Sequence, residues 1–131
     1  MAVADRHGTP VGVYIESASP HEVKLVEKTL DAMALPFAPS LLIGDKAYDS
    51  DGLDQRLKEE YGTEMVAPNR GKRKKTQDGR KLRRYVRRWK VERVFAWLQK
   101  LRRLVSRYEY HAANFLSFLQ LGCITILLGR L

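Results

Sequence analysis

The chain has 131 residues, 44% of them hydrophobic, which is the size and composition of one globular domain. Its 24 lysines and arginines against 15 aspartates and glutamates give a net charge of +9, so we expect a polyanionic partner, with nucleic acid ahead of an acidic membrane. A single cysteine excludes an internal disulfide, three scattered histidines argue against zinc, and no apolar run is long enough to span a bilayer. These features predict a cytoplasmic protein.

The first forty residues predict a β-hairpin followed by a helix. Apolar and β-branched residues at 1–4 and 11–17 are typical of two strands separated by a turn-rich segment. Ser19 is expected to be the N-cap of the helix, with Pro20 at the first helical position and Glu22 completing a capping box. Apolar residues at helical spacing continue as far as Met33. We expect this helix to have a packing role.

A short apolar strand at 40–44 is followed directly by Asp45. A continuously apolar run is typical of a strand that is buried on both faces of a parallel sheet. Open α/β sheets place their chemistry at the carboxyl ends of such strands, which makes Asp45 a candidate functional residue. The alternative is that Asp45 caps the next helix, although Asp49, Ser50 and Asp51 are better placed for capping.

Between residues 51 and 80 the sequence predicts a helix, a strand and a basic loop. The helix covers 51–61 with Gly62 as its stop, and the strand covers 63–67. The loop at 69–80 is basic and contains glycine, so it can follow a phosphate backbone. A merely solvated run of charge is the alternative. Because the loop leads into a basic helix, we expect it to contact DNA through Lys72, Arg73, Lys74 and Lys75.

A long basic helix is predicted at 81–107. At 100° per residue its side chains separate into two stripes. The apolar stripe is Val91, Val94, Leu98, Leu101 and Val105, and the second stripe is Tyr85, Arg88, Glu92, Gln99 and Arg103. Glu92 is the only acidic residue between positions 84 and 100, and a solvated face does not require one carboxylate among so many cations. The alternative is an ordinary surface helix with an i,i+4 ion pair between Arg88 and Glu92.

The last predicted helix, at 114–128, is apolar on nearly all sides. We therefore expect it to be buried against the sheet or against a partner. Cys123 lies within it among apolar neighbours and is interpreted as a buried small hydrophobic residue.

Two motifs resemble the bacterial insertion-sequence transposases of the DDE type. Residues 42–50, with the sequence LIGDKAYDS, resemble the block around the second catalytic aspartate of that group. Tyr85, Arg88 and Glu92 have the Tyr-x2-Arg-x3-Glu spacing of its Tyr-Arg-Glu-Lys signature. The resemblance covers essentially the whole chain, since three further segments are similar, at 5–10, 93–98 and 102–104.

The resemblance implies a fold and a set of roles. The fold is an incomplete ribonuclease-H-like α/β fold, whose central mixed sheet lacks its first strand and is flanked by helices. Asp45 and Glu92 become catalytic carboxylates that ligate Mg²⁺ or Mn²⁺, because these ions take hard oxygen ligands. Tyr85 and Arg88 become contacts to DNA phosphate near the end of the element. Gln99 stands where the signature has lysine, and the neighbouring Lys100 is its expected substitute.

The resemblance also bears on how much of the catalytic machinery is present. The resemblance implies that the first catalytic aspartate belongs to a strand upstream of Met1, and that Asp5 matches a non-catalytic position. We therefore expect residues 1–131 to form a single domain, the C-terminal portion of a DDE transposase catalytic domain, with its C-terminal helices at 81–131. Such a chain is either a truncated copy or one product of a split reading frame.

The function implied is metal-dependent DNA cleavage and strand transfer at insertion-sequence ends when the domain is complete. The expected partners are terminal-repeat and target DNA, together with the upstream transposase part or a second copy, and the expected location is the nucleoid. One alternative is a catalytically inactive DNA-binding fragment or regulator of transposition. Another is a remnant that does not fold stably.

Overall fold

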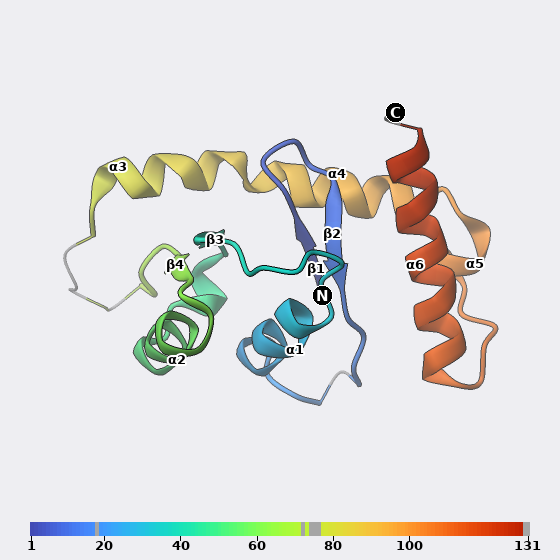
Figure 1. Ribbon diagram of the computed structural model, residues 1–131, viewed down its shortest axis with the longest axis horizontal. Helices are drawn as coiled ribbons and strands as arrows, with labels where there is room; N and C mark the ends of the chain where they lie inside the picture. Colours follow the sequence, from blue (N-terminus) through green and yellow to red (C-terminus); the bar gives the residue numbers. More distant parts are fainter. Residues whose placement is uncertain (18, 72, 74–76, 130–131) are drawn as a thin grey trace.

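The computed structural model describes residues 1–17, 19–71, 73 and 77–129, and it is a mixed α/β structure (Figure 1). Its strands, α-helices and 3-10 helices (η) follow in the order β1 (Ala2–Ala4), β2 (Pro10–Val13), η1 (Glu22–Lys24), α1 (Leu25–Asp31), β3 (Leu41–Ile43), η2 (Lys46–Tyr48), α2 (Asp51–Tyr61), β4 (Glu64–Val66), α3 (Gly79–Leu82), η3 (Arg83–Arg88), α4 (Trp89–Leu98), α5 (Arg102–Val105) and α6 (Ala112–Leu128).

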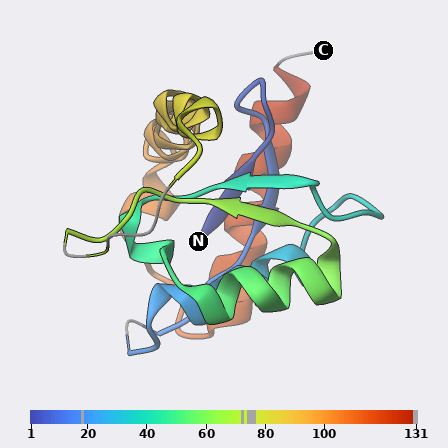
Figure 2. The ribbon, with the colours of Figure 1, turned by 90° about the vertical axis from the view of Figure 1, so that its left-hand side faces the viewer.

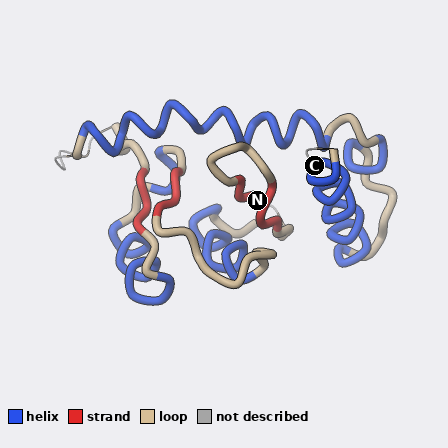
Figure 3. Tube along the Cα trace, turned by 45° about the horizontal axis from the view of Figure 1, so that its top comes forward, coloured by secondary structure: helices blue, strands red, loops and turns tan. Residues whose placement is uncertain are grey.

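The strands form two separate two-stranded sheets, which corrects the prediction of one central mixed sheet. In one sheet β1 and β2 are antiparallel, with Ala2 opposite Val13. In the other β3 and β4 are parallel, with Leu41 opposite Glu64. Figure 3 shows the two pairs standing apart below the long helical segment. In the described residues, the facing edges of β1 and β3 do not pair with each other, so the sheets remain separate.

Each sheet has its own hydrophobic core. The hairpin packs against α4 and α6 through Val13, Val94, Leu98 and Cys123, as expected for a buried Cys123. The parallel sheet lies over α2 (Figure 2), and its core is made by α1 and α2 through Val26, Leu30, Leu53 and Leu57. The parallel strand β3 is only partly buried, unlike the fully covered strand that its apolar sequence predicts.

The two helices of the N-terminal half differ in how well the sequence predicted them. The first begins later than expected, because His21 caps η1 and the helix continues as α1, so the predicted capping box at Ser19 is wrong. The second matches the prediction from Asp51 to Tyr61. Ser50 caps its start, and Gly62 ends it with a φ of 63°, a left-handed conformation that favours glycine.

The basic helix is shorter than predicted. α3, η3 and α4 form one nearly continuous helical segment (Figure 1), but α4 ends at Leu98. Leu101 has an extended backbone, with φ −90° and ψ 108°, and α5 starts after it. The predicted apolar stripe is therefore correct at Val94 and Leu98, which are buried, and wrong at Val105, which is 62% exposed.

The last helix is also less buried than its composition predicts. Of the residues of α6, Gly122 and Cys123 are buried, where the helix packs close to α4 and α5. One side remains exposed, with Leu121, Ile124 and Leu128 open to solvent. A helix can be apolar all round and still bury only the side that its neighbours reach. Within the described ranges, no helix has the length and apolar character needed to cross a membrane.

Candidate functional site

Asp45 lies directly beyond the carboxyl end of β3. The Gly44 N–H still donates to the Val66 carbonyl of β4 at 3.0 Å, so the strand pairing holds Asp45 in position. The Asp45 Oδ1 atom accepts the Ala47 N–H at 2.7 Å and caps η2. Asp45 therefore does cap a helix, as the alternative to a functional role predicted. Capping uses only one carboxylate oxygen, and Oδ2 remains available to another partner.

Gly44 allows an aromatic ring to lie against the end of β3. A Cβ atom built on Gly44 would come within 2.8 Å of Cδ2 of Tyr48, so a larger residue would displace the ring. Burial raises the pKa of the Tyr48 hydroxyl above its ordinary value, and the nearby charges of Glu22 and Asp45 raise it further. Tyr48 therefore stays neutral at physiological pH. Its side chain lines the same cavity as Asp45.

Arg88 brings Asp45 and Glu92 together. Its Nη2 atom lies 2.7 Å from Glu92 Oε1, and its Nη1 atom lies 3.8 Å from Asp45 Oδ2. The three side chains line one cavity of about 410 Å³, which also borders β1 and β3. Two carboxylates that are distant in sequence thus face a single guanidinium.

The donor set of this site fits a divalent cation. Both carboxylates supply hard oxygen atoms of the kind that Mg²⁺ and Mn²⁺ prefer, and both already lie against one positively charged group. The side chains are 36% exposed at Asp45 and 56% exposed at Glu92, so an ion can reach them. Among the described residues, no group of three or more potential ligands is gathered in one place.

Tyr85 belongs to the same cluster. Its ring centroid lies 5.6 Å from the Arg88 guanidinium carbon, and both residues are in η3 just before α4. A 3-10 segment within a longer helix often marks a functional hinge or a strained sequence. The stripe predicted from sequence is therefore contiguous from Tyr85 through Arg88 to Glu92, but the prediction is wrong for Gln99 and Arg103, because α4 ends at Leu98.

The basic loop is described only in part. Lys72, Lys74 and Lys75 lie outside the described residues. Arg73 contacts two acids rather than projecting outward, since its Nη1 atom is 2.6 Å from Asp49 Oδ1 and its Nη2 atom also pairs with Asp51. The base of the basic segment is thus fastened to the turn that follows Asp45.

Lys100 is not brought to the carboxylates. It is exposed in the turn that ends α4, and eight residues of helical rise place it about 12 Å along the axis from Glu92. The structure therefore joins Asp45, Tyr85, Arg88 and Glu92, and leaves Lys100 apart from them.

Arg93 was not singled out from the sequence, although it fixes the helix that carries Glu92. Its guanidinium lies 4.9 Å from the Trp89 ring centroid and 4.8 Å from that of Trp97. The same group donates to the His7 carbonyl at 2.8 Å, which docks the β1–β2 turn on α4. The Trp-x3-Arg-x3-Trp spacing was a readable signal, because residues four apart share a helix face.

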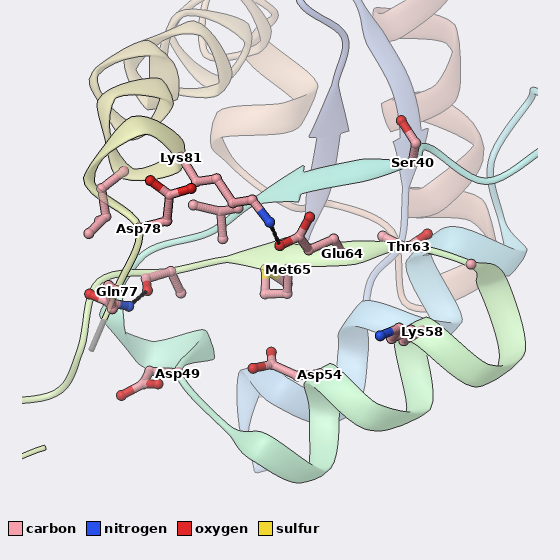
Figure 4. A pocket seen from close by; sticks show the side chains of 14 residues that line it. Ser40, Asp49, Asp54, Lys58, Thr63, Glu64, Met65, Gln77, Asp78 and Lys81 are labelled. Atoms are coloured by element: carbon pink, nitrogen blue, oxygen red, sulfur yellow. Dashed lines mark hydrogen bonds and ion pairs between the residues drawn. The ribbon is translucent and has the colours of Figure 1, made fainter. Parts of the chain in front are cut away.

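A second cavity lies beside the outer edge of β4 and is separate from this site. Figure 4 shows Asp49, Asp54 and Asp78 around it, with the Lys81 ammonium paired to Glu64. The Gln77 side chain donates to the Ala67 carbonyl at 2.7 Å and accepts the Asn69 N–H at 3.1 Å. These contacts attach the start of α3 to the parallel sheet and so position the helical segment that leads to Arg88.

Two comparisons with known proteins both match transposases. The sequence model of the family described as "Transposase DDE domain" matches residues 1–128. A protein of Burkholderia cepacia assigned as the transposase of insertion sequence element IS402 is 33% identical over 132 residues, which cover 95% of this chain. The matched region spans 59% of the length of that relative. No solved structure matches the chain.

Proposed function

This chain belongs to the transposase DDE domain family, and from that premise we propose that it forms part of the metal-dependent catalytic domain of an insertion-sequence transposase. The observation that carries the proposal is that Asp45 and Glu92 both lie against the Arg88 guanidinium.

Asp45 and Glu92 are proposed to hold a divalent metal ion. When bound, such an ion activates a water or a DNA 3′-hydroxyl for in-line attack and neutralises charge on the phosphate. The chain's own contribution is to fix two carboxylates on separate elements, one at the end of β3 and one in the first turn of α4. The Ala47 N–H holds the Asp45 carboxylate in place through its other oxygen.

DNA is the proposed substrate and partner. Arg88 lies against the carboxylates with the Tyr85 ring beside it, and a guanidinium can bind two phosphate oxygens at once. The basic loop precedes this segment, and its lysines Lys72, Lys74 and Lys75 are proposed to contact the DNA backbone. Arg73 is proposed to anchor that loop, because its guanidinium is already engaged by Asp49 and Asp51.

The arrangement of the two sheets supports a ribonuclease-H-like fold completed by one more strand. Met1 and Tyr14 exchange backbone hydrogen bonds at 2.7 and 3.0 Å, so the next residue, Ala2, directs its N–H and C=O away from β2. Ser40 and Gly44 bond to β4, so Leu41 and Ile43 direct their backbone groups away from β4. Both free edges border the cavity that contains Asp45 and Glu92.

We propose that a strand from outside this chain occupies the space between β1 and β3 and carries the remaining catalytic carboxylate. Residues 1–131 would then be the C-terminal portion of the catalytic domain. Two-stranded sheets are marginally stable by themselves, and an added strand would join them into one sheet with fewer exposed edges.

A second candidate is that the chain by itself binds DNA without cutting it. The observation in favour is that only two of the required carboxylates meet in the part of the chain that the structure describes. Fewer charged ligands lower the affinity for the metal, and turnover falls with it. The chain would then act as a DNA-binding regulator of transposition.

Metal and DNA binding test the proposal with the 131-residue chain. We expect Mn²⁺, followed by its electron paramagnetic resonance signal, to bind the wild type and to bind Asp45→Asn and Glu92→Gln at least tenfold more weakly. Glu60→Gln, an exposed acid on α2, is the matched control and should bind Mn²⁺ like the wild type. Equal Mn²⁺ binding by all four proteins would refute the metal site.

Nicking of supercoiled DNA by the same chain separates the two candidates. Brisk Mn²⁺-dependent nicking that Glu92→Gln abolishes would show that the chain is active by itself. DNA binding without nicking supports the regulator, and nicking restored by adding the missing strand supports the split catalytic domain.

A further inference from the structure

We propose that Arg88 holds the place of the divalent cation between Asp45 and Glu92 when no metal is bound, and that metal binding transfers its guanidinium to DNA phosphate. This inference rests on the proposed function, and it adds a regulation of the same site. It makes Arg88 a positioning residue whose partner depends on the metal.

The contacts of Arg88 carry the first step. One guanidinium spans both carboxylates, with Nη2 2.7 Å from Glu92 and Nη1 3.8 Å from Asp45. A metal ion ligated by the same carboxylates would bring two positive charges against this guanidinium, and like charges repel. The metal and Arg88 therefore compete for one position.

The surroundings of Arg88 carry the second step. A third cavity also borders β1 and β3, and its charged lining is mainly cationic, with Arg84, Arg87 and Lys90. Arg88 is the one charged side chain that borders both this cavity and the carboxylate-lined cavity among the residues described. When it leaves the carboxylates, it joins a group of cations that suits a phosphate.

The side chain has the freedom that such a transfer requires. It is 37% exposed, and its contact with Asp45 is longer than a hydrogen bond. Exposed ion pairs of this kind are weak, so the exchange is energetically accessible. The Tyr85 ring, 5.6 Å away, offers the guanidinium a contact that does not depend on the carboxylates.

Metal and DNA binding then become coupled. Without metal, Arg88 is occupied by Asp45 and Glu92 and contributes little to DNA affinity. With metal, it is available to phosphate. Because coupling between two ligands is reciprocal, DNA should strengthen metal binding by the same factor.

Mn²⁺ titration of the full chain, with Arg88→Gln and Arg87→Gln as a matched pair, tests the competition. Both variants remove one positive charge from the same 3-10 helix, but Arg87 has no ion pair with a carboxylate among the described residues. We expect Arg88→Gln to bind Mn²⁺ about fivefold more tightly than Arg87→Gln. Equal affinities of the two variants, or weaker binding by Arg88→Gln, would overturn the proposal.

DNA binding tests the transfer, with a short labelled duplex of arbitrary sequence as the probe. We expect Arg88→Gln to lower DNA affinity less than twofold without Mn²⁺ and about fivefold with it. The slope of log DNA affinity against log salt concentration should become shallower by about 0.9, and only when Mn²⁺ is present. Arg87→Gln should cost the same with and without metal. An Arg88→Gln loss that does not depend on Mn²⁺ would mean that Arg88 contacts DNA in both states, against the proposal.

A folding control and a second variant keep the outcome clear. Circular dichroism establishes that Arg88→Gln is folded; if it is not, Arg88→Lys replaces it. Lysine keeps the charge but lacks the planar fork that spans two carboxylates, so Mn²⁺ affinity should rise about twofold, and an unchanged affinity would count against the exchange. If Asp45→Asn and Glu92→Gln both bind Mn²⁺ as tightly as the wild type, the metal site itself is refuted. If these two variants lose Mn²⁺ binding but Arg88→Gln leaves it unchanged, the metal site stands and only the exchange with Arg88 is refuted.

Discussion

Arg73 and Asp49 form an ion pair at 2.6 Å that joins the basic segment to the turn after β3. The Asp49 side chain is only 7% exposed, and its Oδ2 atom also accepts the Arg70 N–H at 2.9 Å. Arg70 in turn donates to the carbonyls of Lys46 and Ala47 at 3.2 and 2.6 Å. The turn that presents Asp45 and the start of the basic segment are therefore held together as one unit.

Replacing Arg73 by methionine should destabilise the chain. The Asp49 carboxylate would remain nearly buried with one of its main partners removed, and the free energy of unfolding should fall by about 2 kcal/mol. Urea unfolding measures it. Lys81→Met is the control, because its pair with Glu64 is exposed at both ends and should be worth less than about 1 kcal/mol. Equal losses in the two variants would show that Arg73 does not anchor the segment.

Gly8→Ala should be costlier than Gly62→Ala. Both glycines have a positive φ, of 77° and 63°, so each substitution costs about 1 kcal/mol in backbone conformation. A Cβ atom at Gly8 would also lie 2.6 Å from Nη2 of Arg93, which is held by Trp89 and Trp97, whereas nothing lies within 4 Å at Gly62. We expect the free energy of unfolding to fall by about 1 kcal/mol more for Gly8→Ala than for Gly62→Ala. Thermal unfolding measures the difference, and equal melting temperatures of the two variants would argue against the docking of the hairpin turn on α4.

Asp5 should make stability depend on pH. Burial by itself raises the pKa of Asp5, but hydrogen bonds from the Thr9 and His7 N–H groups outweigh it and hold the pKa below its ordinary value of 3.8. A carboxyl with a lowered pKa stabilises the fold above the unfolded-state value, and the contribution is lost as the pH falls through the folded-state value. Asp5→Asn should therefore be less stable than the wild type at pH 7, and the difference should close below pH 3.8. Urea unfolding of both proteins across this range measures the difference, and a gap that stays constant with pH would contradict the assignment.

Cys123 should be unreactive in the folded chain. The thiol is buried between α6, α4 and the hairpin, and burial raises its pKa, so little thiolate is present at pH 8. Reaction with a chromogenic disulfide should be slow in buffer and fast in urea. Fast reaction without denaturant would mean that α6 does not stay packed on α4.

The sequence predicted elements well where local signals suffice. Ser50 and Gly62 mark the two ends of α2, because capping and left-handed glycine are properties of a few adjacent residues. The sequence predicted poorly the features that depend on contacts with other elements, namely the end of the basic helix and the burial of α6. The basic helix ends at Leu98 because Leu101 turns the chain toward α5, and α6 buries only Gly122 and Cys123 because its neighbours reach only one side.

By itself the sequence determined that Asp45 ends an apolar strand, that Glu92 shares a helix face with Arg88 and Tyr85, and that the motifs are those of a DDE transposase. Only the tertiary structure decided that Asp45 and Glu92 reach the same guanidinium, that Arg73 is engaged by Asp49, and that β1 and β3 stay unpaired. The physical reason is the distance along the chain over which each kind of interaction acts. Hydrogen bonds along the chain and side-chain periodicity act over a few residues, whereas the meeting of charges from different elements depends on how the two cores pack.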